Sequence, residues 1–91
     1  LNGYLEITLI VTNNGNIKKP VISYKGIPEK NEDNTFLFDM EDEIMNICRT
    51  FSMDSKKQEH NLIEVIKQNC RRIVREKTGK KPYTNINIAR I

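Results

Sequence analysis

A run of basic residues near the end of the chain is the part of the sequence best suited to binding a ligand. It comprises Lys67, Arg71, Arg72, Arg75, Lys77, Lys80 and Lys81, and Glu76 is the one carboxylate between positions 71 and 81. Such a surface can bind a nucleic acid of any base sequence, because each cation that contacts a phosphate releases counterions from the backbone. A solvated helix face, whose cations complement the negative end of the helix dipole, is the alternative that the sequence leaves open.

Charge is unevenly divided along the chain. Residues 1–45 carry four Lys and eight carboxylates, whereas residues 46–91 carry eleven Lys and Arg and four carboxylates, so net charges of −4 and +7 sum to +3. This asymmetry favours an acidic partner for the basic half, and nucleic acid is the commonest such partner. Tyr83 is the one aromatic residue near the basic run, so base stacking gains little support.

The chain offers little for catalysis. His60 is its only histidine, and its place beside Asn61 at the expected start of a second helix favours a capping or surface role. Cys48 and Cys70 fall at apolar positions of helical patterns, which favours two reduced core thiols of a cytosolic protein over a disulfide or a metal site. We therefore expect no catalytic residue and no metal site within the chain.

An acidic cluster precedes the basic half. It consists of Asp39, Glu41, Asp42 and Glu43. We expect a helix to begin near Asp39, so that these carboxylates occupy its first turn, where the helix dipole favours negative charge. A cation site is the less favoured interpretation, because oxygen ligands must converge from more than one segment.

The first third of the sequence predicts a β-hairpin. From Tyr4 to Thr12 apolar residues alternate, with Leu5, Ile7, Leu9 and Val11 on one face. Residues 13–16 tolerate positive φ and predict a reversal into a second strand from Ile17 to Tyr24. Pro20 cannot donate a ladder hydrogen bond, so this second strand lies at an edge or is split by a bulge.

The remainder predicts two helices and a final strand. One apolar stripe joins Met40, Ile44, Ile47, Cys48 and Phe51, and a second joins Leu62, Ile63, Ile66, Cys70, Ile73 and Val74. Ser52–Glu59 connects them, Gly79 caps the second helix, and Pro82 prevents it from resuming. The last strand runs from Tyr83 to Ile91. The order ββααβ predicts an α+β domain in which two helices pack on one face of a three-stranded sheet.

The order of these features resembles the small C-terminal domain of ribonuclease J, a bacterial enzyme of the metallo-β-lactamase and β-CASP ribonuclease family. The matching features are the opening strand with its Asn and Gly turn, a second strand closing on Gly26, Ile27 and Pro28, the acidic helix start, the Arg71 and Arg72 pair, and Gly79, Lys80, Lys81 and Pro82 before a final hydrophobic strand. The likeness spans essentially all 91 residues. The Gly, Ile, Pro motif after the second strand and the Gly, Lys, Lys, Pro motif before the last strand resemble the alphaproteobacterial branch of the family.

The resemblance implies that residues 1–91 are a single C-terminal domain cut from a larger ribonuclease, as does a start at Leu1 rather than Met. Enzymes of this family degrade and mature RNA as endonucleases and as exonucleases acting from the 5′ end. They use metal ions, usually zinc, held by His and Asp motifs of the lactamase domain, and none of those motifs occurs in this chain. The resemblance implies a non-catalytic domain whose partners are the rest of the parent ribonuclease, a second copy in a homo-oligomer, and RNA.

A stand-alone nucleic-acid-binding module of the KH type is the alternative, because one version of that fold has the same ββααβ order. KH domains need a Gly-x-x-Gly loop to clamp the nucleic acid backbone, and Ser52–Glu59 contains no glycine. No apolar run approaches the roughly 20 residues that span a bilayer. We therefore expect a soluble, cytoplasmic domain without membrane contact.

Overall fold

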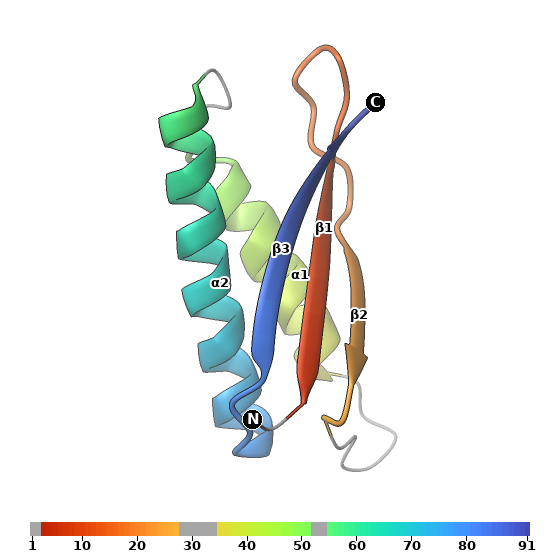
Figure 1. Cartoon of the computed structure of the whole chain (residues 1–91), viewed down its shortest axis with the longest axis vertical. Helices are drawn as coiled ribbons and strands as arrows, with labels where there is room; N and C mark the ends of the chain where they lie inside the picture. The colour runs from red at the N-terminus through yellow and green to blue at the C-terminus, as the bar shows by residue number, and fades with distance from the viewer. Residues whose placement is uncertain (1–2, 28–34, 52–54) are drawn as a thin grey trace.

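A computed structural model gives the fold of the chain (Figure 1). It describes residues 3–27, 35–51 and 55–91. The elements follow the order β1 (Tyr4–Val11), β2 (Val21–Lys25), α1 (Thr35–Cys48), α2 (Lys56–Thr78) and β3 (Tyr83–Arg90). Pro28 and most of the predicted loop after the hairpin, as well as residues 52–54 of the predicted interhelical connection, lie outside the described residues.

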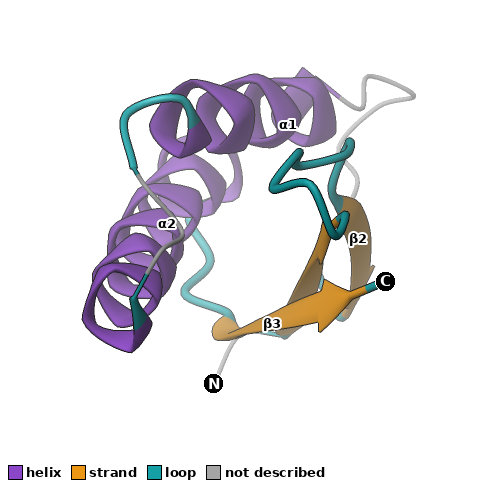
Figure 2. Ribbon diagram, turned by 90° about the horizontal axis from the view of Figure 1, so that it is seen from above, coloured by secondary structure: helices purple, strands orange, loops and turns teal. Residues whose placement is uncertain are grey.

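The three strands form one mixed sheet in the order β2-β1-β3. β1 pairs antiparallel with β2 and parallel with β3, with Tyr4 opposite Tyr83 and Val11 opposite Arg90 in the parallel pair. Parallel neighbours need a crossover connection, which α1 and α2 supply here. Viewed along the strands, both helices lie on the same side of the sheet (Figure 2). The predicted α+β fold is therefore confirmed.

Pro20 sets the limits of β2. The turn after β1 closes through hydrogen bonds from Thr12 N to Asn16 O at 2.9 Å and from Gly15 N to Thr12 O at 3.0 Å. A single bridge from Val11 to Ile17 follows, and regular pairing resumes only at Val21. The prediction that this strand lies at an edge is confirmed by the order β2-β1-β3, whereas the strand itself begins at Val21 rather than at Ile17.

Helix α1 begins four residues earlier than predicted, at Thr35 rather than near Asp39. No carboxylate therefore lies in its first turn, and the interpretation of Asp39, Glu41, Asp42 and Glu43 as helix-start residues is wrong. The apolar stripe begins upstream at Phe36, which is 4% exposed, and burial of that ring extends the helix beyond the acidic cluster. The helix ends at Cys48, so Phe51 packs against the core from the segment after it.

Helix α2 is capped at both ends. Ser55 accepts a hydrogen bond from Gln58 N, as an N-cap residue does, and Gly79 takes the left-handed conformation at φ 76° with its N–H bonded to Arg75 O. Gly79 as the C-cap was predicted. His60 is exposed in the helix interior rather than at its start, so a surface position is confirmed and a capping role is wrong.

One core fills the space between the sheet and the helices. The predicted β1 face (Leu5, Ile7, Leu9 and Val11) is buried, and so are Met40, Ile44, Leu62, Ile66, Cys70 and Val74 from the helices. The two predicted apolar stripes meet in this core: Ile44, Ile66, Cys70 and Ile73 belong to one cluster, and Ile47 and Phe51 pack against it. Within the described residues, no helix has the length and apolar character required to cross a membrane.

Candidate nucleic-acid and subunit interfaces

A basic depression of about 330 Å³ lies on the surface of α2. Its lining consists of Gln68, Arg71, Arg72, Arg75 and Lys81. The first four project from successive turns of α2, since residues three and four apart share a helix face. Lys81 reaches the same place because the chain reverses at Gly79 and returns toward β3.

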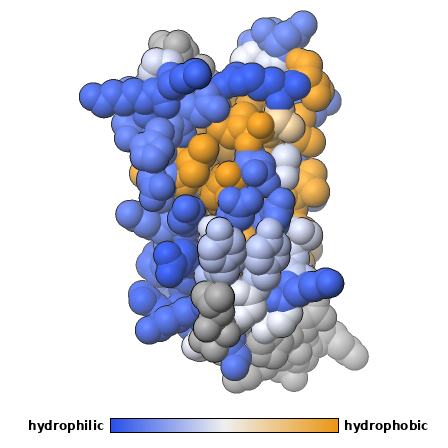
Figure 3. All heavy atoms as spheres, in the orientation of Figure 1, coloured by the Kyte–Doolittle hydropathy of each residue, from blue (hydrophilic) through white to orange (hydrophobic). Residues whose placement is uncertain are grey.

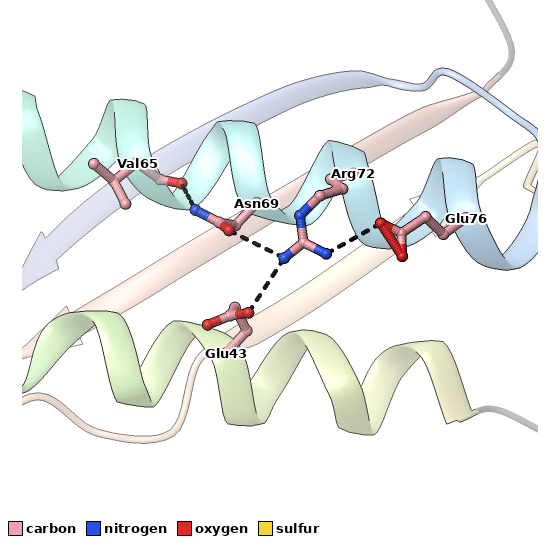
Figure 4. Close-up of polar contacts among 5 residues, drawn as sticks. All are labelled: Glu43, Val65, Asn69, Arg72 and Glu76. Carbon is pink, nitrogen blue, oxygen red and sulfur yellow. Dashed lines mark hydrogen bonds and ion pairs between the residues drawn. The ribbon is translucent and has the colours of Figure 1, made fainter.

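Arg72 belongs both to this depression and to a network between the helices (Figure 4). Its guanidinium donates to Glu43 of α1 at 3.4 Å, to Glu76 at 3.1 Å and to the side-chain oxygen of Asn69 at 3.1 Å. Asn69 in turn donates to Val65 O at 2.8 Å, which fixes the amide. The charge of Arg72 is therefore neutralised by carboxylates of both helices.

Lys77 is neutralised in the same way. Its Nζ lies 3.2 Å from a carboxylate oxygen of Asp39 on α1. A second depression, of about 310 Å³, lies between the helices at this place, and Asp39, Glu43, Asn46, Arg72, Ile73, Glu76 and Lys77 line it. Three carboxylates face two cations there, so this side of α2 carries no excess of positive charge.

Arg71 and Arg75 differ from Arg72 and Lys77, which are both paired with carboxylates. Each is exposed, and within residues 3–27, 35–51 and 55–91 no carboxylate lies within 4.0 Å of either guanidinium. The lining of the basic depression contains no Asp or Glu. Among its arginines, Arg72 is neutralised by Glu43 and Glu76, whereas Arg71 and Arg75 have no carboxylate partner in the described chain.

The structure brings together four of the seven basic residues predicted from the sequence, namely Arg71, Arg72, Arg75 and Lys81. Lys77 lies on the other side of the helix in the ion pair with Asp39. In the described part of the chain, Lys67 and Lys80 lie outside the lining. Sequence analysis missed Gln68, although its spacing of three, four and seven residues from Arg71, Arg72 and Arg75 places it on their face.

The sheet presents a second candidate surface, on the face that the helices leave uncovered. Alternate residues of the strands reach it: Tyr4, Glu6, Thr8 and Ile10 of β1, Val21, Ser23 and Lys25 of β2, and Tyr83, Asn85, Asn87 and Ala89 of β3. Apolar side chains gather over the strands on this face, whereas the side formed by α2 is hydrophilic (Figure 3).

Two tyrosines form a fixed platform at one end of this open face. The rings of Tyr4 and Tyr83 stack with centroids 5.8 Å apart and an interplanar angle of 17°. The Tyr4 hydroxyl donates to Glu6, which raises the pKa of Tyr4, and Glu6 accepts a second hydrogen bond from Asn87 at 2.8 Å. Tyr83 is nevertheless 54% exposed and Val21 is 55% exposed. Stacking and hydrogen bonds thus hold these side chains in place, and the face stays accessible to a partner.

The remaining candidates for chemistry are structural. Cys48 and Cys70 are free thiols within the core, as predicted. Burial raises the pKa of both, that of Cys70 to about 12, with a smaller contribution from Glu43. Among the described residues, no group of three or more His, Cys, Asp or Glu has an arrangement that could hold a metal ion.

The family model described as the ribonuclease J C-terminal domain matches residues 1–91. A comparison with curated proteins found no match.

Proposed function

Because the chain belongs to the ribonuclease J C-terminal domain family, we propose that it is a non-catalytic domain of an RNA-degrading and RNA-processing enzyme and that its main role is subunit association. The family match covers all 91 residues. Hydrolysis of RNA then belongs to the other domains of the parent enzyme. The family resemblance likewise leads us to expect zinc in the catalytic domain of the parent enzyme.

The open sheet face is the observation that supports association. Tyr4, Tyr83, Val21 and Ile91 are large apolar or aromatic residues, and each exposes between 38% and 69% of its surface. Tyr4 and Tyr83 lie at one end of this face and Ile91 follows the other end of β3, with Glu6, Asn85 and Asn87 between them. Apolar and aromatic residues exposed on one face are typical of a protein interface. β3 also ends the sheet, and an edge strand has unpaired backbone groups that a second chain can use. A second copy of the domain is the partner that we propose.

Sedimentation of the domain over a concentration series tests this role. We expect association that weakens at least tenfold in the double variant Tyr4→Ser and Tyr83→Ser, because the aromatic platform contributes large contact area. Phe38→Ser is the matched control, since Phe38 is 65% exposed but lies on α1 rather than on the sheet. A wild-type domain that stays strictly monomeric at millimolar concentration would contradict the proposal, as would dissociation caused by Phe38→Ser alone.

The cellular setting forms part of the same proposal. A cytoplasmic enzyme agrees with the two reduced thiols, because disulfides are rare in that compartment. The alphaproteobacterial lineage rests on the Gly26, Ile27 and Pro28 and the Gly79 to Pro82 motifs of the sequence. The gene's flanking sequence tests both points, because it would give the source and the upstream catalytic domain.

RNA contact is the second role that we propose, and the basic depression supports it. The stand-alone KH-type module predicted as an alternative gains no support from the family match. In an RNA-processing enzyme, the substrate is the polyanion that an accessible basic surface meets most often.

A further inference from the structure

We infer that the basic depression on α2 binds the sugar–phosphate backbone of RNA, with Arg71 and Arg75 as the two contacting cations. This inference rests on the proposed function in one respect, namely that the parent enzyme acts on RNA. The choice of these two residues rests on the structure, because the basic run divides into neutralised and unneutralised members.

The division follows from the position of α1. Arg72 and Lys77 point toward α1 and pair with Glu43 and Asp39. Arg71 and Arg75 are exposed and have no ion pair in the described chain. A phosphate that approaches Arg72 or Lys77 must compete with a carboxylate. At Arg71 and Arg75 it displaces only water and counterions, and counterion release drives such binding.

The geometry suits a chain of phosphates better than a single anion. Arg71 and Arg75 are four residues apart on one helix face, so they are separated by about 6 Å along the axis. Each guanidinium can donate two parallel hydrogen bonds to one phosphate. Lys81 adds a cation from a different segment, and the Gln68 amide adds both a donor and an acceptor at the edge of the depression.

Complementation of the helix dipole does not account for Arg71, although it contributes at Arg75, which lies in the last turn of α2. That effect falls off within the last turn of a helix, and Arg71 lies more than one turn before Gly79. The last carbonyls also have other donors, since Gly79 N bonds Arg75 O at 2.8 Å and the Thr78 hydroxyl bonds Val74 O at 2.7 Å. Arg71 and Arg75 are therefore available to an external anion.

The lining also indicates how RNA would be recognised. None of the residues that line the depression is aromatic, so it offers no ring on which a base can stack. Binding through phosphates carries no sequence information. We expect affinity that depends strongly on salt and hardly at all on base composition.

The test compares two double variants of the intact ribonuclease that contains this domain. Arg71→Gln with Arg75→Gln removes two charges from the depression, and Lys56→Gln with Lys57→Gln removes two charges from the exposed start of the same helix. Binding of a cleavage-resistant single-stranded RNA is measured by fluorescence anisotropy over a series of salt concentrations. We expect the first variant to flatten the slope of log K against log salt by about 1.4, since each phosphate contact in a single strand contributes about 0.7. We expect the control to leave the slope unchanged.

Two further arms separate the alternatives. Sedimentation of the same variants at the same protein concentration is expected to show unchanged association, so that a loss of RNA affinity with intact association supports the site. If the variant has the same slope of log K against log salt as the wild type, or if it loses RNA affinity only because its subunits dissociate, the RNA site is overturned. Neither result bears on the proposed role of the open sheet face in association. Inorganic phosphate at constant ionic strength is expected not to displace the RNA, and displacement at low millimolar phosphate would overturn the assignment to a polymer backbone.

Discussion

The two sides of α2 both carry basic residues but differ in electrostatic character. On the side that faces α1, Arg72 and Lys77 meet three carboxylates, whereas the lining of the depression on the other side adds Arg71, Arg75 and Lys81 and contains no carboxylate. Arg71 and Arg72 are adjacent in the sequence, yet only Arg72 has a carboxylate partner among the described residues. The position of a cation relative to the neighbouring helix, rather than the charge of the run as a whole, decides which residues can bind an external anion.

The comparison also explains the acidic cluster of α1. Asp39 and Glu43 are partners of Lys77 and Arg72 across the helix pair, and Glu41 lies 3.2 Å from Lys19 Nζ on the segment before β2. Each pair is partly exposed, so each contributes at most about 1 kcal/mol. The pairs made by Asp39 and Glu43 neutralise Lys77 and Arg72 on one side of α2. Arg71 and Arg75 on the other side stay accessible to an external anion.

Removal of the core contacts of Ile66 on α2 is expected to have the largest effect on stability. Ile66 is fully buried and packs in the cluster with Ile44, so Ile66→Ala should lower the free energy of unfolding by about 2 to 5 kcal/mol. Chemical denaturation of the domain measures this. Gln68→Ala, at an exposed position two residues away, is the control and should change stability by less than about 0.5 kcal/mol. Equal effects of the two substitutions would mean that α2 is not held by its apolar stripe.

The buried thiol of Cys70 predicts a loss of stability in alkali. The pKa of Cys70 is raised from 9.0 to about 12 in the folded chain, so the neutral thiol stabilises the fold fully below pH 9 and this contribution is lost as the pH rises toward 12. The unfolded chain ionises first, which lowers the free energy of unfolding by about 1.4 kcal/mol per pH unit in that window. Denaturation at several pH values should show a shallower decline for Cys70→Ala than for the wild type. Parallel curves would show that Cys70 is accessible to solvent.

A smaller effect should distinguish the two neighbouring arginines by stability alone. Arg72→Gln removes the contacts with Glu43 and Glu76 and should cost about 1 kcal/mol or less, because the pairs are partly exposed. Arg71→Gln removes no ion pair in the described chain and should lie within about 0.5 kcal/mol of the wild type. Thermal or urea unfolding measures both variants. A larger cost for Arg71→Gln would show that it has a structural partner.

Periodicity predicted the elements and the buried faces well, because apolar spacing reports directly which side of a strand or helix is covered. The buried face of β1, the C-cap at Gly79 and the edge position of the strand that follows Pro20 all followed from local rules. The start of α1 did not, because a carboxylate near a helix start and a carboxylate that pairs with a second helix look alike in sequence. The tertiary burial of Phe36 decided between them.

The candidate site was predictable in composition but not in arrangement. Helical spacing of four residues places Lys67, Arg71 and Arg75 on one face of α2. It could not show that α1 would lie against Arg72 and Lys77, nor that the reversal at Gly79 would bring Lys81 beside Arg71. The order β2-β1-β3, which creates the Tyr4 and Tyr83 platform through a parallel pair, also depends on long-range packing that local patterns do not encode.

The most direct test of the central claim compares Arg75→Gln with Lys77→Gln in the intact enzyme. Each removes one positive charge from the last turn of α2, but Lys77 is paired with Asp39 and Arg75 is not paired in the described chain. The salt dependence of RNA binding is measured for both. The account predicts that Arg75→Gln flattens the slope by about 0.7 and that Lys77→Gln leaves it unchanged. Equal slopes for the two variants would contradict it, because the charge of the helix end as a whole, and not the unneutralised side, would then bind RNA.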